Sequence, residues 1–549
     1  MRTFLLSVGI IFLACTGTTS GTGGGSASGG GNASGGGTAG GGASTGGGVA
    51  TGGGSATGGG AGAGGGAATG GGASVGGGSA GGGSATGGGD AGTGLPNFTD
   101  RCFPVQPPAP PAPLRTLYVD AVNGDDTHTG LSATDAWKTL AKVNGAAQAG
   151  DLVNVTGVFD GGYLRPANSG TPAHPIVFQA NNAVIMNAQY NVGLWIAGVS
   201  YAEFDGFELT GDEAPTDFLN ADHVVVRNSN IHDATGYVRF IDSNDNRFEN
   251  NHWVDCPSYC FFMSGGANRN VVANNQLGGA NNVMLYLGGS AADPSADNVI
   301  TFNELGPSSD GQVILTGAIT GTELSCNRIH GAGTADAGAS PSITLTASNN
   351  VLRENLIYDN RAEPIRLQAI GGNDVTGNLI SHNDVWGNDG PDLRFLLSQP
   401  GAVLEDNEVV DNIFWGNNLT QDSHWVSNGV GYRVVFDTYH QQLNGYPDGG
   451  LGNNRIHHNL VGSNAADLDG GWLYFIGYST NRTFNLAGAE ANWPDQLHDD
   501  FEADPLFANP DAGHFMLLMG SPAIDQAVDD GGFVFSGAAP DLGRYELVP

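Results

Sequence analysis

The chain has 549 residues and carries 54 acidic against 19 basic side chains, a formal net charge of −35 at pH 7. A surface this acidic repels nucleic acid and anionic lipid, and no basic stripe interleaved with aromatic residues offsets the repulsion, so nucleic-acid binding is excluded. Glycine alone contributes 92 residues, and 41 of them lie within residues 16–94, a stretch that cannot bury a core.

Residues 1–14 have the pattern of a secretory signal peptide. One basic residue, Arg2, precedes an apolar run over residues 4–13 that is too short to span a bilayer. The stretch Phe12-Leu13-Ala14-Cys15 is similar to a bacterial lipobox, in which the cysteine becomes the acylated first residue of the mature chain. We therefore predict export, with Cys15 as the lipid attachment of a lipoprotein at the bacterial cell surface or outer membrane. Secretion after ordinary cleavage is the alternative.

A disordered tether is predicted after the signal. Residues 16–94 are almost wholly Gly, Ala, Ser and Thr, with one acid, Asp90, and no lysine or arginine. Such a composition buries no core and behaves as a flexible linker, so residues 15–94 are interpreted as a lipid-anchored tether. Residues 95–114 contain a run of prolines and are predicted to form a stiffer spacer.

The folded domain is predicted to span residues 115–549, with an entry and cap over 115–200, repeat coils over 201–465 and a closing segment over 466–549. Leu140, Val143, Ala146 and Ala147 fall on one helical face. We expect this short helix to plug the open end of a solenoid, where exposed strands would otherwise aggregate.

Between residues 204 and 461 one short pattern returns: a small polar residue, any residue, then a large apolar residue. Successive copies begin 22 to 29 residues apart, which is the spacing of a solenoid. The copies begin at Ser229, Asn251, Asn275, Asn303, Asn327, Asn355, Asn378 and Asn407, with a further copy at Asn459. Asparagine tolerates a left-handed backbone, and its amide can bond to the copy one turn away. The repeat therefore predicts a column of asparagines.

The residues around each copy predict strands. Asn298-Val299-Ile300-Thr301-Phe302-Asn303 alternates, is rich in β-branched residues and is bounded by turn formers. Each repeat also carries a second apolar triplet, such as Ile365-Arg366-Leu367. Two or three short strands per turn predict an all-β fold, a parallel β-helix.

With these repeats the chain resembles the right-handed parallel β-helix, pectin-lyase-like superfamily of secreted and surface proteins. The resemblance covers roughly residues 115–549 and specifies the fold better than the function.

Four cysteines remain besides Cys15: Cys102, Cys256, Cys260 and Cys326. Export permits disulfides. One possibility is that Cys256 and Cys260 close a small local loop. The other is that Cys260 and Cys326 fill buried positions of the coils as small apolar residues. The sequence leaves the pairing open.

The middle residues of the second triplets are predicted to face solvent, because strand side chains alternate. They are Arg239, Phe261, Leu285, Ile314, Thr344, Arg366 and Arg394. If the coils stack in register, Arg366 and Arg394 lie about 5 Å apart. Two like charges at that distance need acids or an anionic ligand between them.

The same two coils hold five acids: Asp359, Glu363, Asp384, Asp389 and Asp392. One interpretation is a surface ladder of salt bridges, each worth about 0–1 kcal/mol. The other is a calcium site formed by these acids, with Arg366 and Arg394 as catalytic residues of β-elimination in a uronic polysaccharide. β-Helix polysaccharide lyases resemble the second arrangement.

The chain departs from part of that family. Its only lysines, Lys138 and Lys142, lie in the capping segment, which excludes a lysine base on the coils. An arginine base needs a strongly lowered pKa. The Asn-Thr-Asp and Gly-His-Gly motifs of the hydrolases that share the fold do not occur.

Two hypotheses remain. The first is an exported, monomeric enzyme centred on Arg366 and Arg394, either a calcium-assisted lyase or another polysaccharide-cleaving activity. The second is a non-catalytic surface protein that binds or adheres to a glycan. In both, a polysaccharide is the partner, and the N-terminal lipid is the only membrane contact.

Overall fold

The computed structural model describes residues 97–102, 110–186, 192–211, 214–333, 340–370, 372–399, 402–417, 426–427, 430–431, 433–437, 451–462, 472–476, 482–529 and 535–548. Cys15 and the predicted tether over residues 15–94 lie outside them. The described residues belong to one compact unit, 82–549. None of the helices among them is long and apolar enough to cross a membrane.

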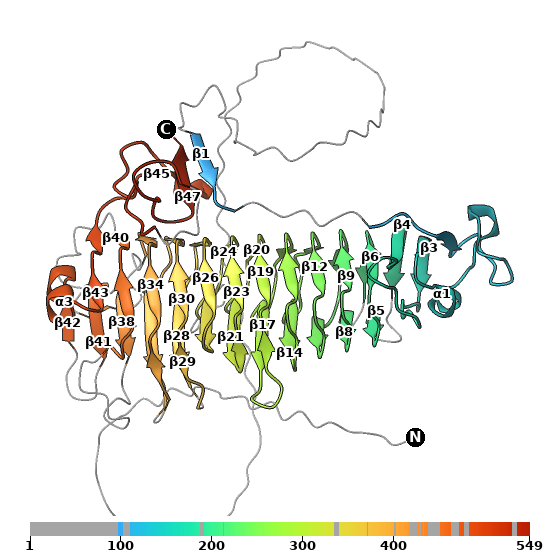
Figure 1. Cartoon of the computed structure of the whole chain (residues 1–549), viewed down its shortest axis with the longest axis horizontal. Coiled ribbons are helices and arrows are strands. Elements are labelled where there is room, and N and C mark those ends of the chain that lie inside the picture. Colours follow the sequence, from blue (N-terminus) through green and yellow to red (C-terminus); the bar gives the residue numbers. More distant parts are fainter. Residues whose placement is uncertain are drawn as a thin grey trace, which may run out of the picture. The chain divides into compact units, whose positions relative to one another are not determined.

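Each coil contributes three short strands. In one coil these are β15 (Val271–Ala273), β16 (Gln276–Leu277) and β17 (Leu285–Gly289), and the next coil repeats them in parallel register. Stacking produces three rows of strands, which we call the first row, the second row and the front sheet (Figure 1). The predicted parallel β-helix is confirmed.

The first row contains β2 (Arg115–Asp120), β3 (Asp151–Asp160), β4 (Ile176–Met186), β6 (Ala202–Asp205), β9 (Val225–Arg227), β12 (Arg247–Glu249), β15, β19 (Val299–Thr301), β23 (Glu323–Ser325), β26 (Val351–Arg353), β30 (Leu379–Ser381), β34 (Glu408–Val410), β39 (Arg455–His457) and β43 (Leu497–His498). The second row shares β4 and continues through β7 (Glu208–Thr210), β10 (Asn230–His232), β13 (His252–Trp253), β16, β20 (Glu304–Leu305), β24 (Arg328–His330), β27 (Leu356–Tyr358), β31 (Asp384–Trp386), β35 (Ile413–Trp415), β40 (Leu460–Gly462) and β44 (Phe501–Glu502).

The front sheet contains β5 (Val192–Ala197), β8 (Ala214–Leu219), β11 (Val238–Ile241), β14 (Phe261–Ser264), β17, β21 (Val313–Gly317), β25 (Ile343–Thr346), β28 (Ile365–Ala369), β32 (Leu393–Leu397), β38 (Val434–Asp437), β41 (Leu473–Ile476) and β42 (Arg482–Phe484). Its strands are parallel except for the last pair, β41 and β42. Short two-stranded pairs are formed by β18 (Ser295–Ala296) with β22 (Ile319–Thr320), β29 (Val375–Thr376) with β33 (Leu404–Glu405), and β36 (Val426–Ser427) with β37 (Val430–Gly431).

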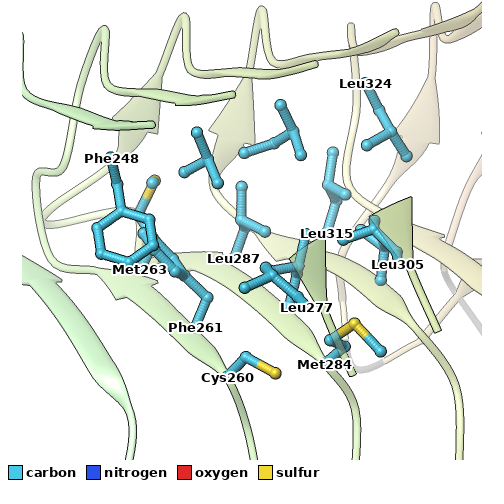
Figure 2. Close-up of a cluster of buried hydrophobic side chains, with 14 of the residues drawn as sticks. Phe248, Cys260, Phe261, Met263, Leu277, Met284, Leu287, Leu305, Leu315 and Leu324 are labelled. Carbon is cyan, nitrogen blue, oxygen red and sulfur yellow. The ribbon is translucent and has the colours of Figure 1, made fainter. Parts of the chain in front are cut away.

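Inward-facing side chains fill the solenoid with a continuous apolar core. Figure 2 shows Phe248, Leu277, Leu287, Leu305 and Leu315 from successive coils, all at most 1% exposed. Because the strands are in register, equivalent side chains from neighbouring coils lie over one another. The core therefore grows by one layer with each coil, as expected of a repeat protein.

Buried asparagines form columns at the turns, as the sequence predicts. Asn303 donates from its backbone and amide nitrogens to Oδ1 of Asn327, at 2.9 and 3.0 Å, and Asn327 donates in the same way to Asn355. The amide of Asn327 also donates to the carbonyl of Ile300. Each amide is thus satisfied in the dry interior, where an unpaired polar group would be costly.

The asparagines that the sequence assigned to a single column belong to two different columns, and this is a correction. Asn355 donates to Asn383 and not to Asn378, whereas Asn378 receives from Asn350 and donates to Asn407. Asparagines recur every five residues within a coil, so the spacing between coils alone does not assign them to a column. The described coils contain three columns. The first runs from Asn246 to Asn298 and resumes with Asn350, Asn378, Asn407 and Asn454. The second runs from Asn251 through Asn355, Asn383 and Asn412 to Asn459, and the third consists of Asn360, Asn388 and Asn417.

We expect Asn327→Ala to lower the free energy of unfolding by about 1–3 kcal/mol. The buried nitrogens of Asn303 lose their acceptor, and the carbonyl of Ile300 loses a donor. Urea denaturation followed by circular dichroism measures the change. Asn281→Ala, whose amide bonds at an exposed position, is the matched control, and an equal loss in both variants would contradict the role of the column.

The N-terminal end of the solenoid is closed as the sequence predicts. Helix α1 (Leu140–Ala146) buries Leu140 and Val143 against the core. The carboxylate of Asp126 accepts hydrogen bonds from the backbone nitrogens of Lys138 and Thr139 at 2.9 and 3.0 Å. The polar loop thus fixes the chain where the helix begins.

The closing segment acts at two places. Helix α3 (Leu486–Asn492) buries Leu486 and Ala489 at the end of the core. The following residues, with β45 (Phe507–Asn509) and β46 (His514–Leu517), fold back over the second row (Figure 1). There Phe515 packs in a cluster with Leu356, Ile413 and Leu460. The segment therefore covers middle coils as well as sealing the last ones.

The fold begins upstream of the predicted start at residue 115. Strand β1 (Asn97–Asp100) pairs antiparallel with β47 (Tyr545–Val548). A disulfide joins Cys102 to Cys326, and a second one joins Cys256 to Cys260. The local Cys256–Cys260 loop is one of the two alternatives left open by the sequence. The Cys102–Cys326 pair was not foreseen, because 224 residues separate its members.

Candidate functional site

Alternate side chains along the strands of the front sheet point away from the core, and one such position in each strand from β5 to β32 forms a row in register. We call it the outer row. In register, it runs through Trp195, Asp217, Arg239, Phe262, Tyr286, Ile314, Thr344, Arg366 and Arg394.

Two members of the predicted row were wrong. Phe261 and Leu285 are 1% and 0% exposed and belong to the core, whereas Phe262 and Tyr286 take the outward positions. In these coils apolar residues lie on both faces of the strand. Alternation therefore gives no signal, and the predicted triplets were one residue out of register.

Four half-buried aromatic side chains gather at this part of the outer row. Phe262 stacks on Tyr286 with ring centroids 5.1 Å apart and planes 4° from parallel. Tyr259 lies 6.0 Å from Tyr286, and Tyr237 lies 5.6 Å from Phe262. Burial raises the pKa of both Tyr259 and Tyr286, so their hydroxyls stay protonated at neutral pH. We call these four residues the aromatic cluster. It combines flat apolar faces with hydrogen-bonding hydroxyls.

Arg366 and Arg394 are neighbours in register, as the sequence predicts. Glu363 accepts hydrogen bonds from Arg366 at 2.7 Å and from Arg394 at 2.9 Å, and Arg394 also pairs with Asp437. The side chain of Glu363 is 1% exposed, whereas those of Arg366 and Arg394 keep 17% and 13%. Two guanidiniums thus lie over one buried carboxylate, with part of each open to solvent.

The charge state of Glu363 decides what this group can do. Burial acts to raise the pKa of Glu363, but Arg366 and Arg394 outweigh burial, and the pKa is lowered. Glu363 is therefore an anion at neutral pH, lying beneath the arginines. The arrangement fixes the two guanidiniums, which suits recognition of a polar or anionic substituent.

The five predicted acids do not come together in one site. Asp392 is buried against Asn417 and Arg433, and burial raises the pKa of Asp392 to about 6. Asp384 lies in the second row beneath the closing segment, where burial raises its pKa well above its usual range.

Asp359 and Asp389 lie near one another. Burial raises the pKa of Asp359, and repulsion from Asp511 and Asp389 adds to this effect. Of the residues that the structure describes, two groups of three side chains have metal-ligand spacing, and neither includes any of the five acids. The five acids thus do not form a group of this kind, and calcium binding stays a prediction. One of the two groups is the Cys102–Cys326 disulfide with Glu354, and the other consists of three histidines.

A groove of about 660 Å³ lies along the first and second rows. Its walls include Gln276, Glu304 and Arg328 from the coils and Arg544 from the closing segment. The charges are largely compensated, since Arg328 pairs with Glu304 at 3.1 Å and Arg544 with Asp100 at 2.8 Å. Sequence reasoning missed this groove because the closing segment builds part of it. It also missed Asp437 and the histidine group, although the adjacent pair His457-His458 was a visible signal.

Comparison with known proteins places the repeats in a described family. Residues 160–299 and 285–439 match the model of a family described as a right handed beta helix region, and together they cover half of the chain. A search of curated proteins finds no match.

Similar solved structures include XylC in complex with xylose, at 13% identity and a TM-score of 0.47, covering 72% of this chain and 87% of the other. A pectate lyase has 14% identity and a TM-score of 0.42, covering 80% and 98%. A polysaccharide lyase from Pseudopedobacter saltans has 16% identity and a TM-score of 0.42, covering 74% and 97%. Likeness at this level bears on neither substrate nor mechanism.

Proposed function

The chain belongs to the right-handed β-helix family, and we propose that within this fold its function is to bind a polysaccharide along the front sheet. One observation carries the proposal: a single row in register joins the aromatic cluster to the Arg366–Glu363–Arg394 group. An extended polymer lying across the strands would meet both.

The spacing of the two groups fits such a ligand. Five strand steps separate Phe262 from Arg394, a distance of about 24 Å. The aromatic faces would bury the apolar faces of sugar rings, and the tyrosine hydroxyls would bond to sugar hydroxyls. Arg366 and Arg394, held by Glu363, would meet a polar substituent further along the chain.

The charge of the protein favours a neutral polysaccharide. A net charge of −35 repels a uronic polymer at low ionic strength. The two arginines do not reverse this, because Glu363 and Asp437 already pair with them.

Calcium-assisted elimination of a uronic polysaccharide is the second candidate. It is favoured by the adjacency of Arg366 and Arg394 on a face where a polymer could lie. The ion pairs of both arginines with Glu363 argue against elimination, because a guanidinium held by a carboxylate is not positioned to act as a base.

We expect Tyr286→Ala to weaken binding of the preferred polysaccharide about fivefold, through the loss of about 1 kcal/mol of aromatic contact. The purified protein is titrated with xylan, a mixed-linkage glucan, pectate and alginate, with and without Ca²⁺, by isothermal calorimetry. In parallel, the ultraviolet absorbance of an unsaturated sugar product reports elimination. Saturable binding without a rise in absorbance is the expected result.

Gln276→Ala is the control, because Gln276 lines the groove on the other face. It is expected to bind like the wild type. If Gln276→Ala weakened binding and Tyr286→Ala did not, the ligand would belong to the groove and the proposal would fail. A Ca²⁺-dependent rise in absorbance that Arg366→Ala abolishes would establish the lyase instead.

A further inference from the structure

Three histidines meet on the outside of the last coils. His457 ends strand β39, His458 follows it in a left-handed turn with φ 55°, and His498 ends strand β43. His457 and His498 are partners in register, and their rings stack with centroids 4.8 Å apart. The stacking of the coils thus brings together residues that are about forty positions apart in the chain.

The ring nitrogens have the spacing of metal ligands. One nitrogen from each histidine lies within 4.8 Å of the others. Nδ1 of His457 is 3.0 Å from Nδ1 of His458. Two nitrogens bound to one tetrahedral Zn²⁺ at about 2.0–2.1 Å lie about 3.3 Å apart. The pair therefore needs only a small adjustment to share an ion.

Carboxylates hold two of the rings from outside, an independent sign of a ligand site. Oε1 of Glu408 lies 3.0 Å from Nε2 of His457, and Oδ2 of Asp499 lies 2.9 Å from Nδ1 of His498. Metal-binding histidines commonly donate their second ring nitrogen to a carboxylate in this way. The contacts leave Nδ1 of His457 and Nε2 of His498 as the nitrogens available to an ion.

The electrostatics of the site suit a cation. The strongly acidic protein raises the local concentration of cations.

We propose that His457, His458 and His498 bind a divalent transition-metal ion, Zn²⁺ in particular. Three imidazole ligands select a borderline ion such as zinc and disfavour calcium, which takes oxygen ligands. The ion would join β39 and the turn after it to β43, and so would fasten the last coils of the solenoid. The fourth coordination position would face solvent, where Asp499 is 66% exposed.

Zn²⁺ binding to the full-length protein tests this inference. After chelator treatment, isothermal calorimetry is expected to show one site, and Co²⁺ is expected to give the visible absorption of a tetrahedral complex. His498→Ala should weaken binding at least about 100-fold, and Glu408→Gln should weaken it about 10–100-fold through its hold on His457.

His223→Ala is the control, because His223 lies on a distant coil and stacks on Tyr201. It is expected to leave the affinity and the Co²⁺ spectrum unchanged. The melting temperature of each variant without metal reports whether it folds. If His498→Ala keeps the site, if His223→Ala weakens it equally, or if the wild type binds no Zn²⁺, the proposal is wrong. Polysaccharide binding at the front sheet is measured separately, so the two proposals can fail independently.

Discussion

Glu363→Ala is expected to lower the free energy of unfolding by about 3–5 kcal/mol. Glu363 is almost fully buried and accepts hydrogen bonds from both Arg366 and Arg394. Without it, two adjacent guanidiniums of the front sheet face one another, although Arg394 keeps its ion pair with Asp437. Chemical denaturation of the purified protein, followed by circular dichroism, measures the loss.

A surface pair of the same kind provides the comparison. Glu323 pairs with Arg353 at 3.0 Å, but the two side chains are 29% and 36% exposed. Glu323→Ala is therefore expected to cost only about 0–1 kcal/mol. If Glu363→Ala does not fold, Glu363→Gln, which keeps the volume and one acceptor oxygen, is expected to fold with an intermediate loss. Equal losses for Glu363→Ala and Glu323→Ala would show that burial adds nothing to this ion pair.

Asp500→Asn is expected to stabilise the protein, and increasingly so as the pH rises. Asp500 ends an asparagine column: its Oδ1 accepts from the backbone and amide nitrogens of Asn459, while its Oδ2 has no hydrogen-bond partner among the described residues. Burial raises the pKa of Asp500 from 3.8 to about 7. An asparagine at position 500 would keep the acceptor oxygen. Its amide nitrogen would also offer a donor, as the amide of Asn459 in the preceding coil does toward the carbonyl of Val409.

The contribution of Asp500 to stability decreases as the pH rises, because its pKa is higher in the folded protein than in the unfolded chain. Because the folded protein holds the proton of Asp500 more tightly than the unfolded chain does, the stability from this group is full below about pH 4. It is lost as the pH rises toward 7. From about pH 5 to pH 8, the free energy of unfolding of the wild type is therefore expected to fall by about 2–3 kcal/mol relative to that of Asp500→Asn. Parallel denaturation curves at several pH values measure this difference.

Asp160→Asn, at the exposed end of β3, is the matched control for the loss of one acid. Its stability is expected to follow that of the wild type across the same pH range. A difference between wild type and Asp500→Asn that does not change with pH would contradict a protonated Asp500 in the folded protein.

Much of the fold was visible in the sequence. The repeat predicted the solenoid, alternation predicted the strands, and the apolar face of residues 140–147 predicted the capping helix. The errors arose where the local signal is symmetrical. Phe261 and Phe262 are both apolar, so alternation did not show which of them faces the core. Asparagines five residues apart looked alike, so Asn378 was assigned to the wrong column.

The candidate site was also predicted only in part. The sequence placed Arg366 beside Arg394, and the structure confirms the pairing, because each is the middle residue of an equivalent triplet in consecutive coils. It also named Glu363 among the nearby acids. It did not separate Glu363, which lies between the arginines, from Asp384, which lies on another face. That distinction depends on which strand of the coil each acid belongs to.

The repeat in the sequence therefore determined the parallel β-helix and many of the neighbours along it, because a repeat turns a separation of one period into a fixed distance of one strand spacing. The tertiary structure alone decided the Cys102–Cys326 disulfide, the return of the closing segment over the middle coils, and the meeting of His457 and His458 with His498. These contacts cross connections of irregular length. No period in the sequence encodes them, and only the packing of the folded chain brings their residues together.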